Sequence, residues 1–78
     1  MKNINKIEKI KINTSFIKLD SLLKLSGEAI TGGQAKILIL SNKILVNGEI
    51  CTMRGKKIRP GDVVSIPELN KNFEVISE

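Results

Sequence analysis

The chain has 78 residues, of which 41% are hydrophobic and 3% aromatic, and its net charge is +5. One cysteine and no histidine exclude a disulfide scaffold, a zinc site built from Cys and His ligands, and any mechanism that needs a catalytic histidine. A chain of this length is predicted to form a single domain over residues 1–78, with one small core and little room for a substrate cleft.

The positive charge is concentrated in one part of the chain. Residues 32–59 carry six basic side chains and one acidic side chain, whereas basic and acidic side chains balance in the rest of the sequence. A block of this kind indicates a polyanionic partner: a nucleic acid, an anionic membrane surface or an acidic protein.

Nothing in the sequence predicts a membrane span or an export signal. The longest apolar run has four residues, 37–40, far below the ~18 that cross a bilayer. The basic start of the chain, residues 1–6, is not followed by the apolar region of a secretory signal. The lone Cys51 is typical of a reducing compartment, so a cytoplasmic location is expected.

The N-terminal part predicts a strand. Ile10 and Ile12 alternate with charged neighbours, which indicates a half-buried strand over about residues 7–12. Ile4 and Ile7 also fit a helical spacing, so the conformation of the first residues stays open.

Residues 19–26 and 33–41 are predicted to form two short helices joined by a turn that contains glycine. Apolar residues recur at helical spacing, at positions 19, 22 and 23 in the first helix and 35, 38 and 39 in the second. Asp20 complements the positive end of the first helix. Neither helix is long enough to be stable alone, so both must pack on other elements.

The second half predicts short strands. Asn47-Gly48 is the strongest hairpin signal, because both residues accept a positive φ, and it separates the apolar run 44–46 from a return strand at 49–52. Further turns are predicted at 54–57, 59–62 and 70–72, and further strands at 63–66 and 73–76. The order of elements predicts a small α+β fold in which a two-helix hairpin packs on a short, mainly antiparallel sheet.

Two basic segments are candidates for anion contacts. Residues 31–36 place two glycines and the donors of Gln34 and Lys36 at a helix start, where phosphate binds well, although the same pattern also fits an ordinary helix cap. This segment lacks the Gly-Lys-Ser/Thr pattern of a nucleotide-binding loop, so an NTPase is not expected. Residues 54–59 contain four cations, which suit either an anion or a solvated turn: Arg54, Lys56, Lys57 and Arg59.

Three other polar residues, Lys43, Asn47 and Asp62, lie at predicted helix ends or turns. Lys43 follows the second helix and either caps its carbonyl groups or contacts a phosphate. Asn47 is first a turn residue, and the Asp62 carboxylate is expected to accept hydrogen bonds from turn N–H groups. No pair of carboxylates suggests acid–base catalysis.

Several segments, in this order and spacing, resemble the RNA-binding domain of ribosomal protein S4, the alpha-L motif, and most closely its stand-alone bacterial YaaA-like members. The similarity covers about residues 14–66 and rests on four stretches: Lys18-Leu19-Asp20, Thr31-Gly32-Gly33-Gln34-Ala35-Lys36, residues 44–49 and residues 54–64. Two departures separate this chain from many family members: Gly32-Gly33 replaces Ser-Arg, and Asn42 replaces Gly or His.

The resemblance implies a non-catalytic domain that binds structured RNA through its helical hairpin and the adjoining turn. Family positions that contact RNA fall on Lys18, Thr31, Gln34, Lys36, Lys43, Asn47 and Gly48. Together with the basic segments, the predicted RNA-binding residues are Lys18, Thr31, Gly32, Gly33, Gln34, Lys36, Lys43, Asn47, Arg54, Lys56, Lys57 and Arg59.

The partner is therefore predicted to be structured RNA, with ribosomal RNA as the natural candidate given the resemblance, in ribosome assembly or translation. The near absence of aromatic residues argues against a binder of single strands, which stacks bases on rings. We expect a monomer that uses no cofactor, metal, membrane or small-molecule substrate. The alternative is an adaptor whose basic face meets an acidic protein. A membrane surface is less favoured, because the predicted helices carry only Lys24 and Lys36.

Overall fold

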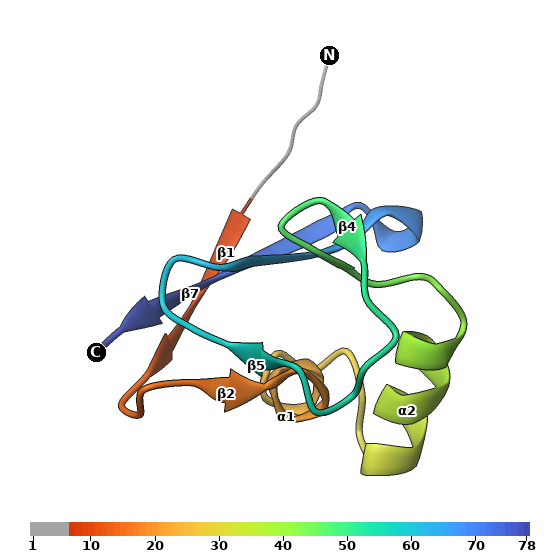
Figure 1. Ribbon diagram of the computed structural model, residues 1–78, viewed down its shortest axis with the longest axis horizontal. Coiled ribbons are helices and arrows are strands. Elements are labelled where there is room, and N and C mark those ends of the chain that lie inside the picture. Colours follow the sequence, from red (N-terminus) through yellow and green to blue (C-terminus); the bar gives the residue numbers. More distant parts are fainter. Residues whose placement is uncertain (1–6) are drawn as a thin grey trace.

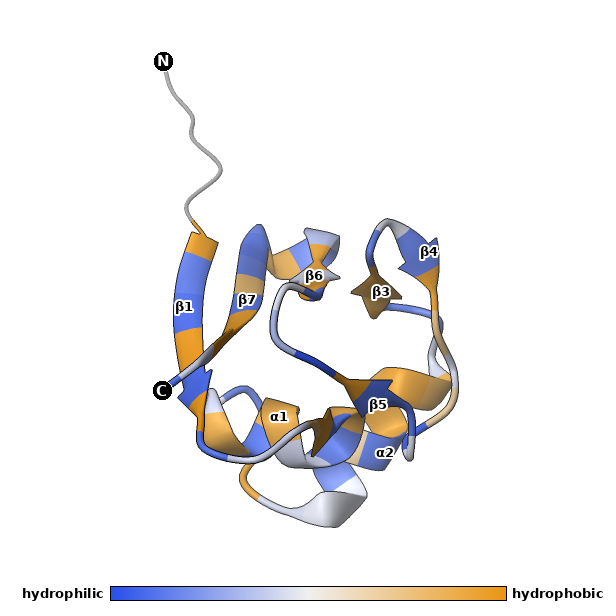
Figure 2. Ribbon diagram, turned by 60° about the vertical axis from the view of Figure 1, so that its left-hand side comes forward, coloured by the Kyte–Doolittle hydropathy of each residue, from blue (hydrophilic) through white to orange (hydrophobic). Residues whose placement is uncertain are grey.

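The computed structural model describes residues 7–78 and consists of a helix pair and a sheet that arches over it (Figures 1 and 2). The five-stranded sheet has the order β1 (Ile7–Ile12), β7 (Lys71–Ser77), β6 (Val63–Ile66), β3 (Leu45–Val46) and β4 (Glu49–Ile50). The helices are α1 (Leu19–Leu25) and α2 (Gly32–Leu40). A separate two-stranded ribbon pairs β2 (Ile17–Lys18) with β5 (Lys57–Ile58), and a 3-10 turn, η1 (Pro67–Leu69), links β6 to β7.

This arrangement confirms the α+β fold with a two-helix hairpin on a mainly antiparallel sheet. The predicted strands at 7–12 and 63–66 and both helices form as expected, with each helix ending one residue earlier than predicted. The alternative helical spacing at Ile4 and the basic residues 1–6 lie outside the described part of the chain.

Strand boundaries in the second half differ from the prediction. Lys57, predicted in a turn, belongs to β5; the return strand ends at Ile50; and β7 already begins at Lys71, so the turn before it is confined to Asn70, whose φ is +55°. The differences at β5 and β7 arise from pairing with distant segments. β5 pairs with β2, and β7 lies between β6 and β1, so neighbours that are remote in sequence lengthen the strands.

The pairing of β1 with β7 is parallel, whereas all other strand pairs are antiparallel. It joins the beginning and the end of the described chain, with Ile10 opposite Val75. Figure 2 shows the alternation of hydrophobic and hydrophilic residues along β1 that the sequence predicts. Its core-facing residues, Ile10 and Ile12, are buried.

The core lies between the helices and the sheet. Leu19, Leu22 and Leu23 of α1 and Ile39 of α2 are fully enclosed, and Phe73 is the largest side chain packed against them. No charged or polar residue among residues 7–78 is buried. Burial of these aliphatic side chains supplies the stability that such short helices and strands lack by themselves.

A polar contact ties the β3–β4 hairpin to the turn before β6. Asn47 and Gly48 both have positive φ, as the hairpin prediction requires. The Asn47 amide donates to Asp62 Oδ1 at 3.1 Å and its carbonyl oxygen accepts from Val63 N at 2.9 Å. Asp62 Oδ2 also accepts from Arg59 N at 2.8 Å, which confirms the predicted turn role of this carboxylate.

The same contact makes the stability of the fold pH-dependent. The hydrogen bond from Arg59 N, with help from the Asn47 amide and the nearby cations, holds the pKa of Asp62 below its ordinary value of 3.8, although partial burial opposes this shift. Because the pKa is lower in the folded state, the stabilisation is fully present above the pKa of the unfolded chain. It is lost as the pH falls through the pKa of the folded protein.

Replacement Asp62→Asn should lower the free energy of unfolding at pH 7 by about 1–2 kcal/mol, because hydrogen bonds to a charged acceptor are lost. The loss of stability between pH 6 and pH 3 should be smaller in this variant than in the unmodified protein. Urea titrations at both pH values measure the effect. Glu49→Gln, at an exposed carboxylate, is the control and should keep the original pH dependence. An unchanged pH dependence in Asp62→Asn would contradict the assignment.

Candidate nucleic-acid interface

The basic turn 54–57 is attached to the start of α1 through the main chain. Leu19 N donates to Lys56 O at 2.9 Å, and Asp20 N donates to Arg54 O at 3.1 Å. The first N–H groups of a helix have no partner within it, and the side chain of Lys18 does not cap α1. The carbonyl groups of the turn fill this role, so the position of the turn follows from the position of α1.

The side chain of Arg54 is held by Asp20. Arg54 Nε lies 3.3 Å from Asp20 Oδ2, while Asp20 Oδ1 accepts from Ser21 N at 2.7 Å. Because Asp20 engages Nε, the two Nη groups remain for other partners. A Cβ atom at position 32 would lie 3.9 Å from Arg54 Nη2, so this guanidinium reaches the first turn of α2. The fold therefore brings a cation to the place where many family members carry Ser-Arg instead of Gly32-Gly33.

The start of α2 is capped by its own side chains. Thr31 Oγ1 accepts from Gln34 N at 3.1 Å, and Gln34 Oε1 accepts from Ile30 N at 2.7 Å. The oxygen atoms of Thr31 and Gln34 thus serve the helix cap, which is the structural alternative that the sequence left open. The side-chain nitrogen of Gln34 and the backbone N–H groups of Gly32 and Gly33 remain as donors suited to an anion.

The β2–β5 ribbon places two cations directly opposite each other. Lys18 pairs with Lys57 in the antiparallel register, next to the apolar pair Ile17 and Ile58. Like charges at such positions destabilise a sheet, and a cation at the start of a helix is also unfavourable. Lys57 Nζ lies 5.0 Å from the centre of the Phe16 ring, which orders this side chain without neutralising it. An anion between the two lysines would relieve the repulsion.

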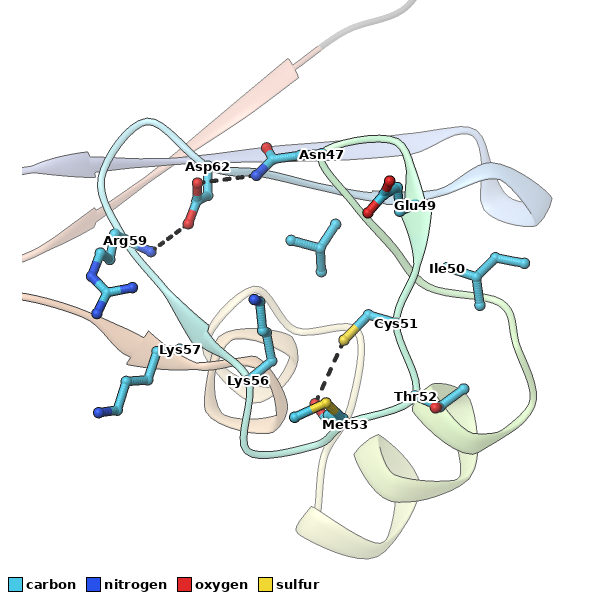
Figure 3. A pocket seen from close by; sticks show the side chains of 11 residues that line it. Asn47, Glu49, Ile50, Cys51, Thr52, Met53, Lys56, Lys57, Arg59 and Asp62 are labelled. Atoms are coloured by element: carbon cyan, nitrogen blue, oxygen red, sulfur yellow. Dashed lines mark hydrogen bonds between the residues drawn. The ribbon is translucent and has the colours of Figure 1, made fainter.

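A groove of about 510 Å³ lies between β5 and the β3–β4 hairpin (Figure 3). Lys56, Lys57 and Arg59 all line this groove, but only the Lys56 side chain reaches into it, whereas the Lys57 and Arg59 side chains extend outward. Glu49 and Asp62 also line it, so its charge is mixed. Lys57 and Arg59 therefore present their charges on the outer side of this segment, whereas Lys56 presents its charge in the groove.

Two predicted contact residues have protein partners elsewhere. Lys43 Nζ lies 2.9 Å from Glu68 Oε1 of η1 in an exposed ion pair, and Asn47 belongs to the contact with Asp62. Within residues 7–78, five predicted cations have no carboxylate oxygen within 4.0 Å: Lys18, Lys36, Lys56, Lys57 and Arg59. We call these five the unpaired cations.

Sequence reasoning missed two residues that organise this surface. Asp20 was assigned only to the helix dipole, yet it holds Arg54 from 34 positions away, and Phe16 lies beneath the amine of Lys57. Neither pairing leaves a local signal in the sequence, because each joins segments that only the fold brings together.

No helix of residues 7–78 is long and apolar enough to cross a membrane. The same residues contain no group of three or more Cys, Asp or Glu side chains arranged to hold a metal ion.

Comparison with known proteins gives a consistent assignment. Residues 10–76 match the family model of the S4 domain. The chain is 38% identical over 68 residues to the probable ribosome maturation protein RlbA of Bacillus subtilis, with 87% of this chain and 94% of that relative covered. It is also 34% identical over 61 residues to the small ribosomal subunit protein uS4 of a Geobacillus strain, with 78% of this chain covered.

The uS4 relatives are much longer than the matched region. The chain covers 30% of the Geobacillus protein and 27% of uS4 of Hahella chejuensis, to which it is 38% identical over 55 residues. The RlbA relative, in contrast, is matched over nearly its whole length. The family match over most of the sequence, together with this relative, shows that the chain belongs to the S4 domain family.

Proposed function

We propose that this protein is a cytoplasmic, monomeric, non-catalytic RNA-binding protein whose ligand is structured ribosomal RNA. The observation that carries the proposal is the direct opposition of Lys18 and Lys57 on the β2–β5 ribbon, without a carboxylate near either of them in residues 7–78. The fold does not neutralise these charges, and a polyanion does.

The shape of the surface favours folded RNA. The ribbon and the basic turn are held to the start of α1 by backbone hydrogen bonds and the Asp20–Arg54 ion pair, so their cations have preset positions. Such a surface reads the spacing of phosphates and ribose hydroxyls along an RNA helix rather than individual bases. Phe16 is partly buried and its ring lies beneath Lys57, so it offers no open stacking platform.

The relatives support a role connected with the ribosome. RlbA is described as a probable ribosome maturation protein, and uS4 is a protein of the small ribosomal subunit. We infer that the whole predicted contact set takes part, with unequal roles. The unpaired cations and Arg54 contact phosphates, the N–H groups of Gly32 and Gly33 and the amide of Gln34 donate to them, and Thr31, Lys43 and Asn47 shape the surface.

Removal of two cations from the basic turn should weaken binding to ribosomal RNA and reduce its salt dependence. For Lys56→Ala with Lys57→Ala, the slope of log Kobs against log [KCl] should fall by about one for each lost phosphate contact. Fluorescence anisotropy with a labelled fragment of ribosomal RNA measures both quantities.

The matched control is Lys9→Ala with Lys11→Ala, which removes the same charge from exposed positions of β1. It should leave the affinity close to that of the unmodified protein. Equal effects of the two double variants would show that only net charge matters. Association with ribosomal particles that survives nuclease treatment would instead favour the acidic-protein alternative.

Replacement Lys18→Gln should stabilise the free protein and weaken RNA binding at the same time. It removes the repulsion with Lys57 and an unfavourable cation at the start of α1, so the free energy of unfolding at low salt should rise by about 0.5–1 kcal/mol. This gain should shrink in 0.5 M KCl. Urea titrations at two salt concentrations and RNA titrations of the same samples provide the test, and a loss of stability would contradict it.

Replacement Asp20→Asn should reduce RNA affinity several-fold, although it removes a negative charge from a positive surface. The reason is that Arg54 loses the partner that directs its Nη groups toward α2. Glu49→Gln makes the same charge change at an exposed site and should leave the affinity unchanged or slightly higher. An increase in affinity for Asp20→Asn would show that this carboxylate acts only through its charge.

A further inference from the structure

Helix α2 is apolar on two opposite faces. Ala35 and Ile39 are buried against the core, whereas Ile37 and Leu40 on the other side are 69% and 54% exposed. Residues three and four positions apart share a helix face, so Ile37 and Leu40 lie together with Gly33 and Lys36 on this outer face. We call Ile37 and Leu40 the outer apolar pair.

A surface helix of a soluble protein normally presents polar residues on its outer side, and a helix that is apolar all round is normally buried. Single exposed aliphatic residues are common, but here two of them adjoin on a helix whose only charge is Lys36. Helix α1 differs, because Asp20, Ser21 and Lys24 make most of its remaining surface polar. The outer face of α2 is therefore suited to burial against another molecule.

The charge distribution argues against a second copy of this chain as the cover. Symmetric contact through the outer apolar pair would bring two copies of Lys36, and two of the segments that carry the whole net charge of +5, close together. RNA is also a poor cover for this end of the helix, since it offers phosphates, hydroxyls and base edges and is usually bound through aromatic or cationic side chains. A protein with an apolar surface fits the outer apolar pair, and it leaves Lys36 to the phosphates of the proposed RNA surface.

The position of the outer apolar pair on α2 indicates where the docking partner would lie relative to the RNA. Gly33 and Lys36, at the N-terminal end of the same face, belong to the proposed RNA surface, and the outer apolar pair follows them directly along α2. A molecule that buries the outer apolar pair would thus lie next to the bound RNA. We propose that Ile37 and Leu40 dock against a protein component of the ribosomal particle whose RNA this chain binds, an inference that rests on the proposed function.

The test compares two ligands prepared from the same source: intact ribosomal subunits, and the ribosomal RNA extracted from them. The variant Ile37→Gln with Leu40→Gln keeps the charge and uses a residue that favours helices, so fold and RNA electrostatics are preserved. Its affinity for subunits should fall by about tenfold or more, whereas its affinity for extracted RNA should stay within about twofold.

The matched control is Ile7→Gln with Leu69→Gln, which replaces two exposed aliphatic side chains, 50% and 48% exposed, on β1 and η1. It should bind both ligands as the unmodified protein does. If the α2 variant lost affinity equally for subunits and for extracted RNA, RNA would cover the outer apolar pair. If it lost affinity for neither ligand, nothing would cover the pair. Either result overturns the inference. If the unmodified protein bound neither subunits nor extracted RNA, the proposed function would be overturned instead.

Discussion

The geometry of the basic surface depends on one contact, the capping of α1 by the basic turn. Two main-chain carbonyls of this turn accept hydrogen bonds from Leu19 N and Asp20 N, the first donors of the helix. A helix start leaves such donors without partners, so the contact satisfies a requirement of α1 and fixes the turn at the same time. The β2–β5 pairing continues from it, because Lys18 directly precedes α1 and Lys57 is the last residue of the turn.

This contact also explains how a small protein keeps several cations close together on one surface and still folds. Main-chain hydrogen bonds and the buried aliphatic core supply the stability, so the exposed cations need not contribute any. Opposed lysines on a two-stranded ribbon work against folding, and they occur where the family resemblance expects RNA contacts. Lys43 and Lys71, in contrast, each have a glutamate partner.

The arrangement of Asp20, Arg54 and Gly32 shows how the chain differs from much of its family without losing a cation at the second helix. Many members carry Ser-Arg at positions 32 and 33, whereas this chain supplies Arg54 from a turn more than twenty residues later. Asp20 engages one side of the guanidinium and leaves the other directed at α2.

The sequence alone determined the local elements: alternation predicted β1, leucine spacing predicted α1, and Asn47-Gly48 predicted the hairpin, because each depends on neighbours within a few residues. It also located the positive charge in residues 32–59. Only the tertiary structure decided the parallel pairing of β1 with β7, the opposition of Lys18 and Lys57, and the engagement of Lys43 by Glu68. These contacts join segments far apart in the chain, and their partners are selected by the packing of one shared core rather than by any local pattern.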